Sequence, residues 1–158
     1  MSEKKELEFQ KLKICILTIS SSRELSDDKS GDVLEERVLG FGHELFERKI
    51  TKDNKDSIKD IIINWSKNKE IDVIITSGGT GLTETDVTPE ALEEIFEKTI
   101  PGFSVIFHNI SFNKIKTSTI QSRATAGILM ETFIFALPGS PSAVKAVSYT
   151  HLTLPTKA

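Results

Sequence analysis

An apolar run followed at once by a cluster of glycines is the feature that most constrains how this chain folds. Residues 71–75 are mostly β-branched and apolar, which is typical of a strand covered on both faces of a sheet. Residues 77–81 then supply three glycines, and Thr88-Pro89 predicts a helix with Thr88 as its N-cap. A strand, a tight loop and a helix in this order indicate a parallel α/β fold, in which ligands usually bind beyond the carboxyl ends of the strands.

The three glycines Gly78, Gly79 and Gly81 predict a loop that binds an anion. Glycine adopts positive φ angles and leaves backbone N–H groups exposed, and concave sets of such donors hold phosphate or other anions. The alternative is a plain turn between a strand and a helix. Asp86 favours the functional interpretation, because one simple reason to hold a carboxylate beside a phosphate is a Mg²⁺ ion between them.

The rest of the chain repeats the alternation of strand and helix. Apolar runs and helical spacings of apolar residues predict further strands at 14–19, 45–50 and 132–137, and helices at 34–39, 58–65, 92–96 and 103–110. Pro101-Gly102 is expected to end the third of these helices. After a polar lead at 1–11, we therefore expect one domain over residues 12–147, a three-layer α/β/α sandwich with a mostly parallel central sheet.

Two further segments are candidates for the same binding site. Pro138-Gly139-Ser140 follows the last strand and precedes a helix expected at residue 142 or 143, so this second glycine loop could converge with the first at one edge of the sheet. Residues 114–127 are rich in hydroxyls and cations, a composition typical either of an anion-contacting loop or of a solvated surface loop.

Composition excludes several classes of function. A net charge of −3 argues against non-specific binding to nucleic acid, because there is no excess of cations to release counterions. The single Cys15 lies in an apolar run, which predicts a buried, inert thiol in a reducing cytoplasm. The charged start and the lack of a run of 18 apolar residues indicate neither export nor a membrane. His43, His108 and His151 lack metal-ligand spacing.

Generic nucleotide and hydrolase motifs do not account for the glycine loop. No Gly-Lys-Ser/Thr follows it, as a P-loop requires, and the dinucleotide-binding spacing Gly-x-Gly-x-x-Gly is absent. No Gly-x-Ser-x-Gly elbow marks a serine nucleophile.

A combination of motifs resembles the molybdenum cofactor biosynthesis proteins of the MogA/MoaB type, which include the G domain of gephyrin. The resemblance runs from about residue 12 to about 147, and the segment 111–123 is most similar to the MoaB branch. The motifs that carry it are 20–23, Asp28 with Ser30-Gly31, Asp53, 77–81, 86–90, 101–103, 122–124, 126–127 and 136–141.

The resemblance implies an enzyme, a molybdopterin adenylyltransferase. It would use ATP with Mg²⁺ to adenylylate molybdopterin, yielding adenylyl-molybdopterin and pyrophosphate. Asp86 and Asp53 match the two important acids of the family, which implies catalytic roles and a shared Mg²⁺. It also implies a homo-oligomer, trimeric or hexameric, and contacts with other proteins of the pathway. The implied substrate-binding residues are Ser77, Gly78, Gly79, Thr80, Gly81, Ser122, Arg123, Pro138, Gly139 and Ser140.

Other interpretations stay open at this point. The chain could hold molybdopterin or nucleotide without turnover, as a carrier or scaffold. Asp53 or Asp56 could cap the helix around Ile58, and Arg123 could contact a partner subunit. Arg23 and Asp28 could anchor a loop, and Ser30 could cap the helix that follows it.

The last residues depart from the pattern of the rest. Residues 148–158 are β-branched, contain Pro155 and present no helical face. We expect this tail not to be native family sequence, and a native stop codon directly after Ala158 in the source gene would contradict that expectation.

Overall fold

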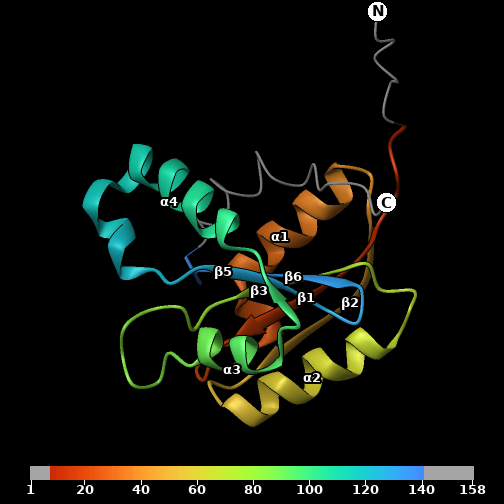
Figure 1. Cartoon of the computed structure of the whole chain (residues 1–158), viewed down its shortest axis with the longest axis horizontal. Coiled ribbons are helices and arrows are strands. Elements are labelled where there is room, and N and C mark those ends of the chain that lie inside the picture. Colours follow the sequence, from red (N-terminus) through yellow and green to blue (C-terminus); the bar gives the residue numbers. More distant parts are fainter. Residues whose placement is uncertain (1–7, 141–158) are drawn as a thin grey trace, which may run out of the picture.

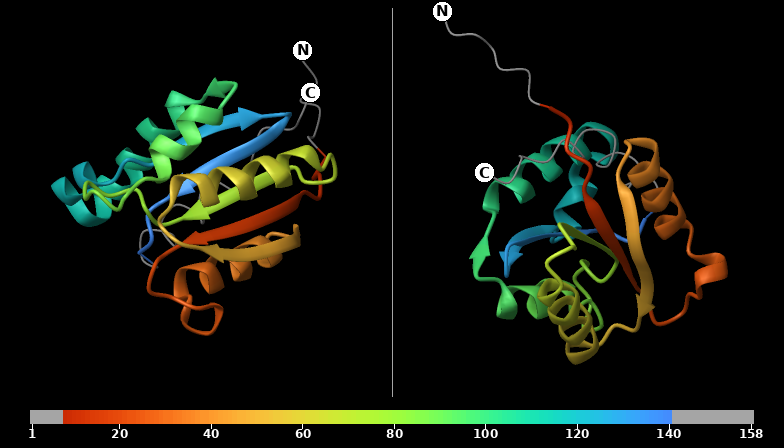
Figure 2. Two further views of the ribbon diagram at one scale, coloured as in Figure 1. Left: turned by 90° about the horizontal axis from the view of Figure 1, so that it is seen from below. Right: turned by 90° about the vertical axis from the view of Figure 1, so that its right-hand side faces the viewer.

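The computed structural model describes residues 8–140, which form a six-stranded sheet in the order β2-β1-β3-β6-β5-β4. Neighbours among β2, β1, β3 and β6 pair in parallel, whereas β5 is antiparallel to β6 and β4 is antiparallel to β5. Figure 2 shows the strands side by side. The strands are β1 (Lys13–Ile19), β2 (Glu44–Thr51), β3 (Val73–Ser77), β4 (Lys98–Thr99), β5 (Thr125–Leu129) and β6 (Thr132–Leu137).

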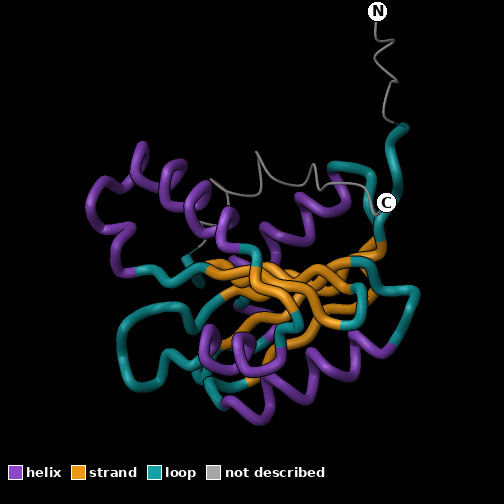
Figure 3. Tube along the Cα trace, viewed as in Figure 1, coloured by secondary structure: helices purple, strands orange, loops and turns teal. Residues whose placement is uncertain are grey.

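Helices cover both faces of this sheet, as the three-layer prediction requires (Figures 1 and 3). One apolar cluster joins α2 (Lys55–Lys67) and α3 (Thr88–Ile95) to one face of the sheet. A second cluster joins α1 (Lys29–Gly40) and α4 (Pro101–Ile115) to the other face. Successive residues of β1 alternate between the two clusters, which explains why this strand is apolar along its whole length.

The predicted core residues Trp65 and Cys15 are buried as expected. Trp65 packs with α2 against the sheet, and its indole N–H donates to the Glu47 carboxylate at 2.7 Å. Cys15 lies inside β1, where burial raises the pKa of its thiol to about 12 and keeps it protonated. Among residues 8–140, no helix is both long and apolar enough to cross a lipid bilayer.

Two of the predicted helix caps are wrong. Asp28, not Ser30, caps α1 by accepting a hydrogen bond from the N–H of Gly31. Val87 occupies the N-cap position of α3, and Thr88 is already helical. The backbone before each helix, rather than the nearest hydroxyl, decides which residue stands at the cap.

The antiparallel half of the sheet was not predicted. The stretch 114–127 was expected to be one loop, but α4 extends to Ile115, a 3₁₀ helix follows over Lys116–Gln121, and β5 begins at Thr125. The turn between β5 and β6 places Met130 and Glu131 at positive φ, the backbone of a two-residue hairpin, without the usual Asn-Gly signal.

The prediction that Pro101-Gly102 ends a helix is also wrong. The helix α3 ends at Ile95, the short strand β4 follows, and Pro101 begins α4 as its first residue. Proline is well suited to this position because the first helical N–H has no partner within the helix. The helix expected at residue 142 or 143, the tail at 148–158 and residues 1–7 of the polar lead lie outside the described residues.

Candidate functional site

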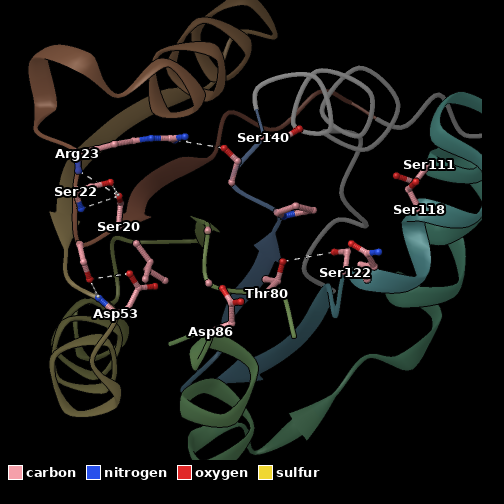
Figure 4. A pocket seen from close by; sticks show the side chains of 18 of the residues that line it. Ser20, Ser22, Arg23, Asp53, Thr80, Asp86, Ser111, Ser118, Ser122 and Ser140 are labelled. Atoms are coloured by element: carbon pink, nitrogen blue, oxygen red, sulfur yellow. Dashed lines mark hydrogen bonds between the residues drawn. The ribbon is translucent and has the colours of Figure 1, made fainter. Parts of the chain in front are cut away.

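A cavity of about 620 Å³ lies at the carboxyl ends of the parallel strands. The loops after β1, β2, β3 and β6 form its floor and one side, and α4 with the following 3₁₀ helix forms the opposite wall. Figure 4 shows Asp53 and Asp86 on the loop side, facing Ser111 and Ser118 across the cavity. This is the position that a parallel α/β sheet predicts for a ligand.

The two glycine loops meet at this edge, as predicted. The N–H of Gly78 donates to the carbonyl of Leu137 at 3.0 Å, and the Ser77 hydroxyl donates to the carbonyl of Pro138 at 3.4 Å. A Cβ built on Gly139 would lie 3.3 Å from the Cα of Gly78. The loops after β3 and β6 therefore form one continuous backbone surface at the base of the cavity.

Close packing explains the first two glycines. Gly78 has φ +105° and Gly79 has φ +70°, and a Cβ on Gly78 would collide with the carbonyl oxygen of Ile19. A Cβ on Gly79 would collide with the Thr88 hydroxyl, which donates to the Gly78 carbonyl at 2.9 Å. Thr88 thus holds the glycine loop instead of capping α3.

A glycine is required at position 81 for a different reason. Gly81 does not have the positive φ that the sequence suggested. A Cβ at this position would lie only 2.6 Å from Oδ2 of Asp86. The glycine therefore lets the Asp86 carboxylate come close to the backbone of the loop.

Asp86 is held in its ionised form by the turn around it. Its Oδ2 accepts hydrogen bonds from the Thr83 hydroxyl at 2.6 Å and from the Thr83 N–H at 3.0 Å. The hydrogen bond from the Thr83 hydroxyl, together with backbone N–H groups and the charge of Arg123, outweighs burial and lowers the pKa of Asp86 below the ordinary aspartate value. Asp86 is consequently a carboxylate at neutral pH.

Asp53 reaches the cavity from the loop after β2. Its Oδ2 accepts from the Ser21 hydroxyl at 2.8 Å, and its own N–H donates back to that hydroxyl at 3.2 Å. Asn54, not Asp53 or Asp56, caps α2 by accepting from the N–H of Ser57. The capping alternative for Asp53 is therefore wrong.

These two carboxylates suit a hard cation that a ligand helps to coordinate. Asp53 and Asp86 are the acidic side chains among the described residues that line the cavity. No group of three or more histidine, cysteine, aspartate or glutamate residues within residues 8–140 could enclose a metal ion by itself. Mg²⁺ commonly takes one or two carboxylates and completes its octahedron with phosphate oxygens and water, so the donor set fits it.

Positive charge is scarce in the cavity. Arg23 is the one cation among the described lining residues, and it donates to the Ser30 hydroxyl at 3.3 Å and to the Gly139 carbonyl at 3.4 Å. These bonds connect the loop after β1 to the loop after β6, in agreement with the anchoring interpretation of Arg23. A polyanionic ligand would therefore meet backbone N–H groups and few charged side chains.

Asp28 anchors the end of the loop after β1, where α1 begins. Its buried carboxylate accepts from the Thr18 hydroxyl at 2.6 Å and from Nη2 of Arg48 at 3.0 Å. Burial alone would raise the pKa of Asp28, but the hydrogen bonds from Thr18, Gly31 and Arg48 outweigh it, and the pKa lies below the ordinary value.

Most of the predicted site residues line one cavity. Ser122 lines it, and its hydroxyl lies 3.5 Å from that of Thr80. Ser77 is buried beneath the loop, and Arg123 is not among the lining residues. The predicted residues that do line the cavity are Asp53, Gly78, Gly79, Thr80, Gly81, Asp86, Ser122, Pro138, Gly139 and Ser140.

Sequence reasoning missed the part of the far wall that Phe107 and Ser111 form on α4. Ile115, Ser118 and Gln121 also line the cavity, and they fall in the stretch 114–127 that the sequence offered as a candidate segment of the site. The apolar spacing of α4 indicated only a packing helix, and no local signal shows that one of its faces borders a cavity. Ser21 was noted only as part of a motif, although it holds Asp53 directly.

Known proteins are similar to this chain in fold and in sequence. A family model described as a probable molybdopterin binding domain matches residues 15–156. Molybdenum cofactor biosynthesis protein B of Escherichia coli strain K12 is 41% identical over 138 residues, which cover 87% of this chain and 81% of that protein. A Methanocaldococcus jannaschii protein named probable molybdopterin adenylyltransferase is 38% identical over 144 residues, covering 87% and 85%. A crystal structure of molybdenum cofactor biosynthesis protein B superposes with a TM-score of 0.85 at 36% identity, covering 90% and 89%.

Proposed function

The chain belongs to the family of molybdopterin-binding domains of molybdenum cofactor biosynthesis, and from this premise we propose that it adenylylates molybdopterin at the cavity. The observation that carries the proposal is the convergence of two glycine loops at a cavity that the carboxylates of Asp53 and Asp86 also line. A relative named for the adenylyltransferase activity supports the same reaction.

The proposed reaction joins two phosphate-bearing molecules. A phosphate oxygen of molybdopterin attacks the α-phosphorus of ATP, the bond between the α-phosphorus and the bridging oxygen to the β-phosphorus breaks, and pyrophosphate leaves with that oxygen. The attacking phosphate is already ionised at neutral pH, so the site needs no strong general base. Its task is to align the reacting atoms and to offset charge.

The chain's own groups suit these tasks. Backbone N–H groups of the glycine loop after β3 would bind phosphate oxygens, and the hydroxyls of Thr80 and Ser122 would orient them. Asp53 and Asp86 would hold Mg²⁺, which when bound would offset the charge of the departing pyrophosphate. Because Arg23 is the one cation among the described lining residues, we expect catalysis to depend strictly on a divalent cation.

Pyrophosphate release from ATP, Mg²⁺ and molybdopterin tests the proposal. Asp86→Asn removes one charged ligand of the proposed metal while keeping a side chain of the same shape. We expect release to fall by about 100-fold or more, since transition-state charge stabilisation of this kind contributes on the order of 10² to 10³ in rate.

Asp56→Asn is the matched control for this experiment. Asp56 is an exposed carboxylate in the first turn of α2, three residues beyond Asp53, and its removal is expected to leave release unchanged. Equal release by wild type and Asp86→Asn, with both proteins folded, would contradict the proposed role of Asp86. Binding of molybdopterin without any release would instead support a carrier.

Other expected properties rest on the family resemblance. We propose that the protein acts in the cytoplasm as a homo-oligomer, trimeric or hexameric, and receives molybdopterin from other proteins of the pathway. Sedimentation velocity measures the oligomeric state, and a monomer at micromolar concentration would contradict it.

A further inference from the structure

Arg123 makes an unusual set of contacts just outside the cavity. Its Nε donates to the carbonyl of Gly81 and its Nη2 to the carbonyl of Asp86, both at 2.9 Å. Its Nη1 pairs with the carboxylate of Glu90 in the first turn of α3. Its backbone N–H donates to the Thr80 carbonyl at 2.8 Å.

The two carbonyls mark the ends of the turn at 81–86 that carries the Asp86 carboxylate. Within this turn, Thr83 and Asp86 bond to each other through backbone and side-chain groups. Residues 82–85 are exposed and belong to no helix or strand. One guanidinium therefore holds both ends of an otherwise protruding turn against the body of the protein.

The geometry of the guanidinium makes this arrangement specific to arginine. A planar fork with separate Nε and Nη donors can reach two carbonyls and a carboxylate at once, whereas a lysine ammonium is a single point of charge. These donors are already engaged with the protein, and about a third of the side chain is exposed. The contacts favour support of the turn over direct binding of a ligand phosphate.

We propose that Arg123 is a positioning residue, which holds the turn at 81–86 so that the Asp86 carboxylate faces the cavity as a ligand for a divalent cation. This inference rests on the proposed metal role of Asp86. Arg123 acts through Asp86 and does not itself contact the reacting phosphates.

Binding of Mn²⁺ in the presence of ATP, measured by electron paramagnetic resonance, tests the inference without turnover. In Arg123→Lys we expect the Mn²⁺ dissociation constant to rise by about tenfold or more, because partners that orient a metal ligand typically contribute 10- to 100-fold to affinity. The Mg²⁺ concentration for half-maximal pyrophosphate release should rise in parallel. The affinity for molybdopterin without metal should change less than about twofold, since Arg123 does not line the cavity.

Two further variants test which of the contacts of Arg123 affect Mn²⁺ binding. Glu90→Gln removes the ion pair but leaves both carbonyl bonds, so we expect a smaller rise in the Mn²⁺ dissociation constant than in Arg123→Lys. Glu94→Gln is the matched control, because Glu94 lies one turn further along α3 and pairs only with Lys55 and Lys59 among its described contacts. It should bind Mn²⁺ as wild type does. If Arg123→Lys does not fold, as judged by circular dichroism, Glu90→Gln carries the test.

The outcomes separate this inference from the proposed reaction. Weaker molybdopterin binding by Arg123→Lys with unchanged Mn²⁺ affinity would overturn the positioning role in favour of a direct ligand contact. Wild-type protein that binds Mn²⁺ but releases no pyrophosphate would contradict the adenylyl transfer, while the Mn²⁺ comparison still decides the role of Arg123. Wild-type protein that binds no Mn²⁺ with ATP would overturn both.

Discussion

At the residue scale, the loop after β1 depends on an ion pair between the buried Asp28 and the partly buried Arg48. Asp28 is fully buried, and it binds Thr18 on β1, the N–H of Gly31 in α1 and Arg48 on β2. Arg48 also pairs with Asp32 and Glu35, which lie towards solvent. The network fixes the start of α1 and hence the end of the loop at 20–28, whose first residues line the cavity.

Replacement of Asp28 is expected to destabilise the protein in a pH-dependent way. Asp28→Asn leaves the partly buried Arg48 without its full counter-charge, which should lower the free energy of unfolding at pH 7 by about 3 kcal/mol. The pKa of Asp28 is lower in the folded protein than in the unfolded chain, where it is about 3.9. The stabilisation that the Asp28 carboxylate provides is therefore fully present above the unfolded pKa, and it is lost as the pH falls from there through the folded pKa. The gap between wild type and Asp28→Asn should therefore narrow below about pH 4.

Urea unfolding between pH 7 and pH 3 measures this gap. Asp32→Asn is the control, since Asp32 binds the same Arg48 but is exposed, and an exposed pair contributes about 1 kcal/mol or less. A loss in Asp28→Asn no larger than that in Asp32→Asn would contradict the proposed importance of the buried pair.

At the scale of single elements, the helix α2 shows how a local signal decides where an element begins. The side chain of Asn54 accepts from the N–H of Ser57, and Lys55 is the first helical residue. Because Asp53 is the residue before this cap, the start of α2 also sets the place of a carboxylate at the edge of the cavity.

Loss of this cap should destabilise the protein measurably. Asn54→Ala is expected to lower the free energy of unfolding by about 1 kcal/mol, because one N–H of the first turn loses its partner. Asp56→Ala, in the same turn but not at the cap, should cost less than about half as much, because it removes only a favourable charge at the helix dipole and a weak exposed ion pair with Lys59. Thermal unfolding followed by circular dichroism compares the two, and equal losses would show that the cap makes no special contribution.

At the scale of the whole molecule, the two apolar clusters share one sheet. Trp65 and Ile62 pack on the α2 side, while Leu34 and Val38 pack on the α1 side. Strand β1 contributes side chains to both clusters. If the helices on either face lose their packing, apolar side chains of β1 on that face become exposed to water. We therefore expect the described part of the chain to unfold as one cooperative unit.

Truncation of a core side chain on one face of the sheet should therefore lower the unfolding midpoint that is measured on the other face. Leu34→Ala is expected to lower the free energy of unfolding by about 2 to 5 kcal/mol. The fluorescence of Trp65, the single tryptophan, reports from the opposite face of the sheet. Its urea midpoint should fall together with the midpoint from circular dichroism, and a fluorescence midpoint that stays at the wild-type value would show that the faces unfold separately.

The parallel half of the sheet, both glycine loops, the candidate carboxylates and the family could all be predicted from the amino-acid sequence. These features are local: strand-length apolar runs, helical spacing and adjacent motif residues are all visible within short windows. The order of strands and helices also implied that ligands bind at the carboxyl ends of the strands, where the cavity lies.

The contacts between residues far apart in the chain could be found only from the folded structure. Strand β4 has two residues, and it exists because β5 pairs with it, which no window of sequence records. Thr88 donates to Gly78 instead of capping its helix, and α4 turns Ser111 towards the cavity. Arg123 binds the carbonyls of Gly81 and Asp86, about 40 residues earlier in the chain. Backbone carbonyls carry no residue-specific signal, so contacts of this kind emerge only when folding brings the segments together.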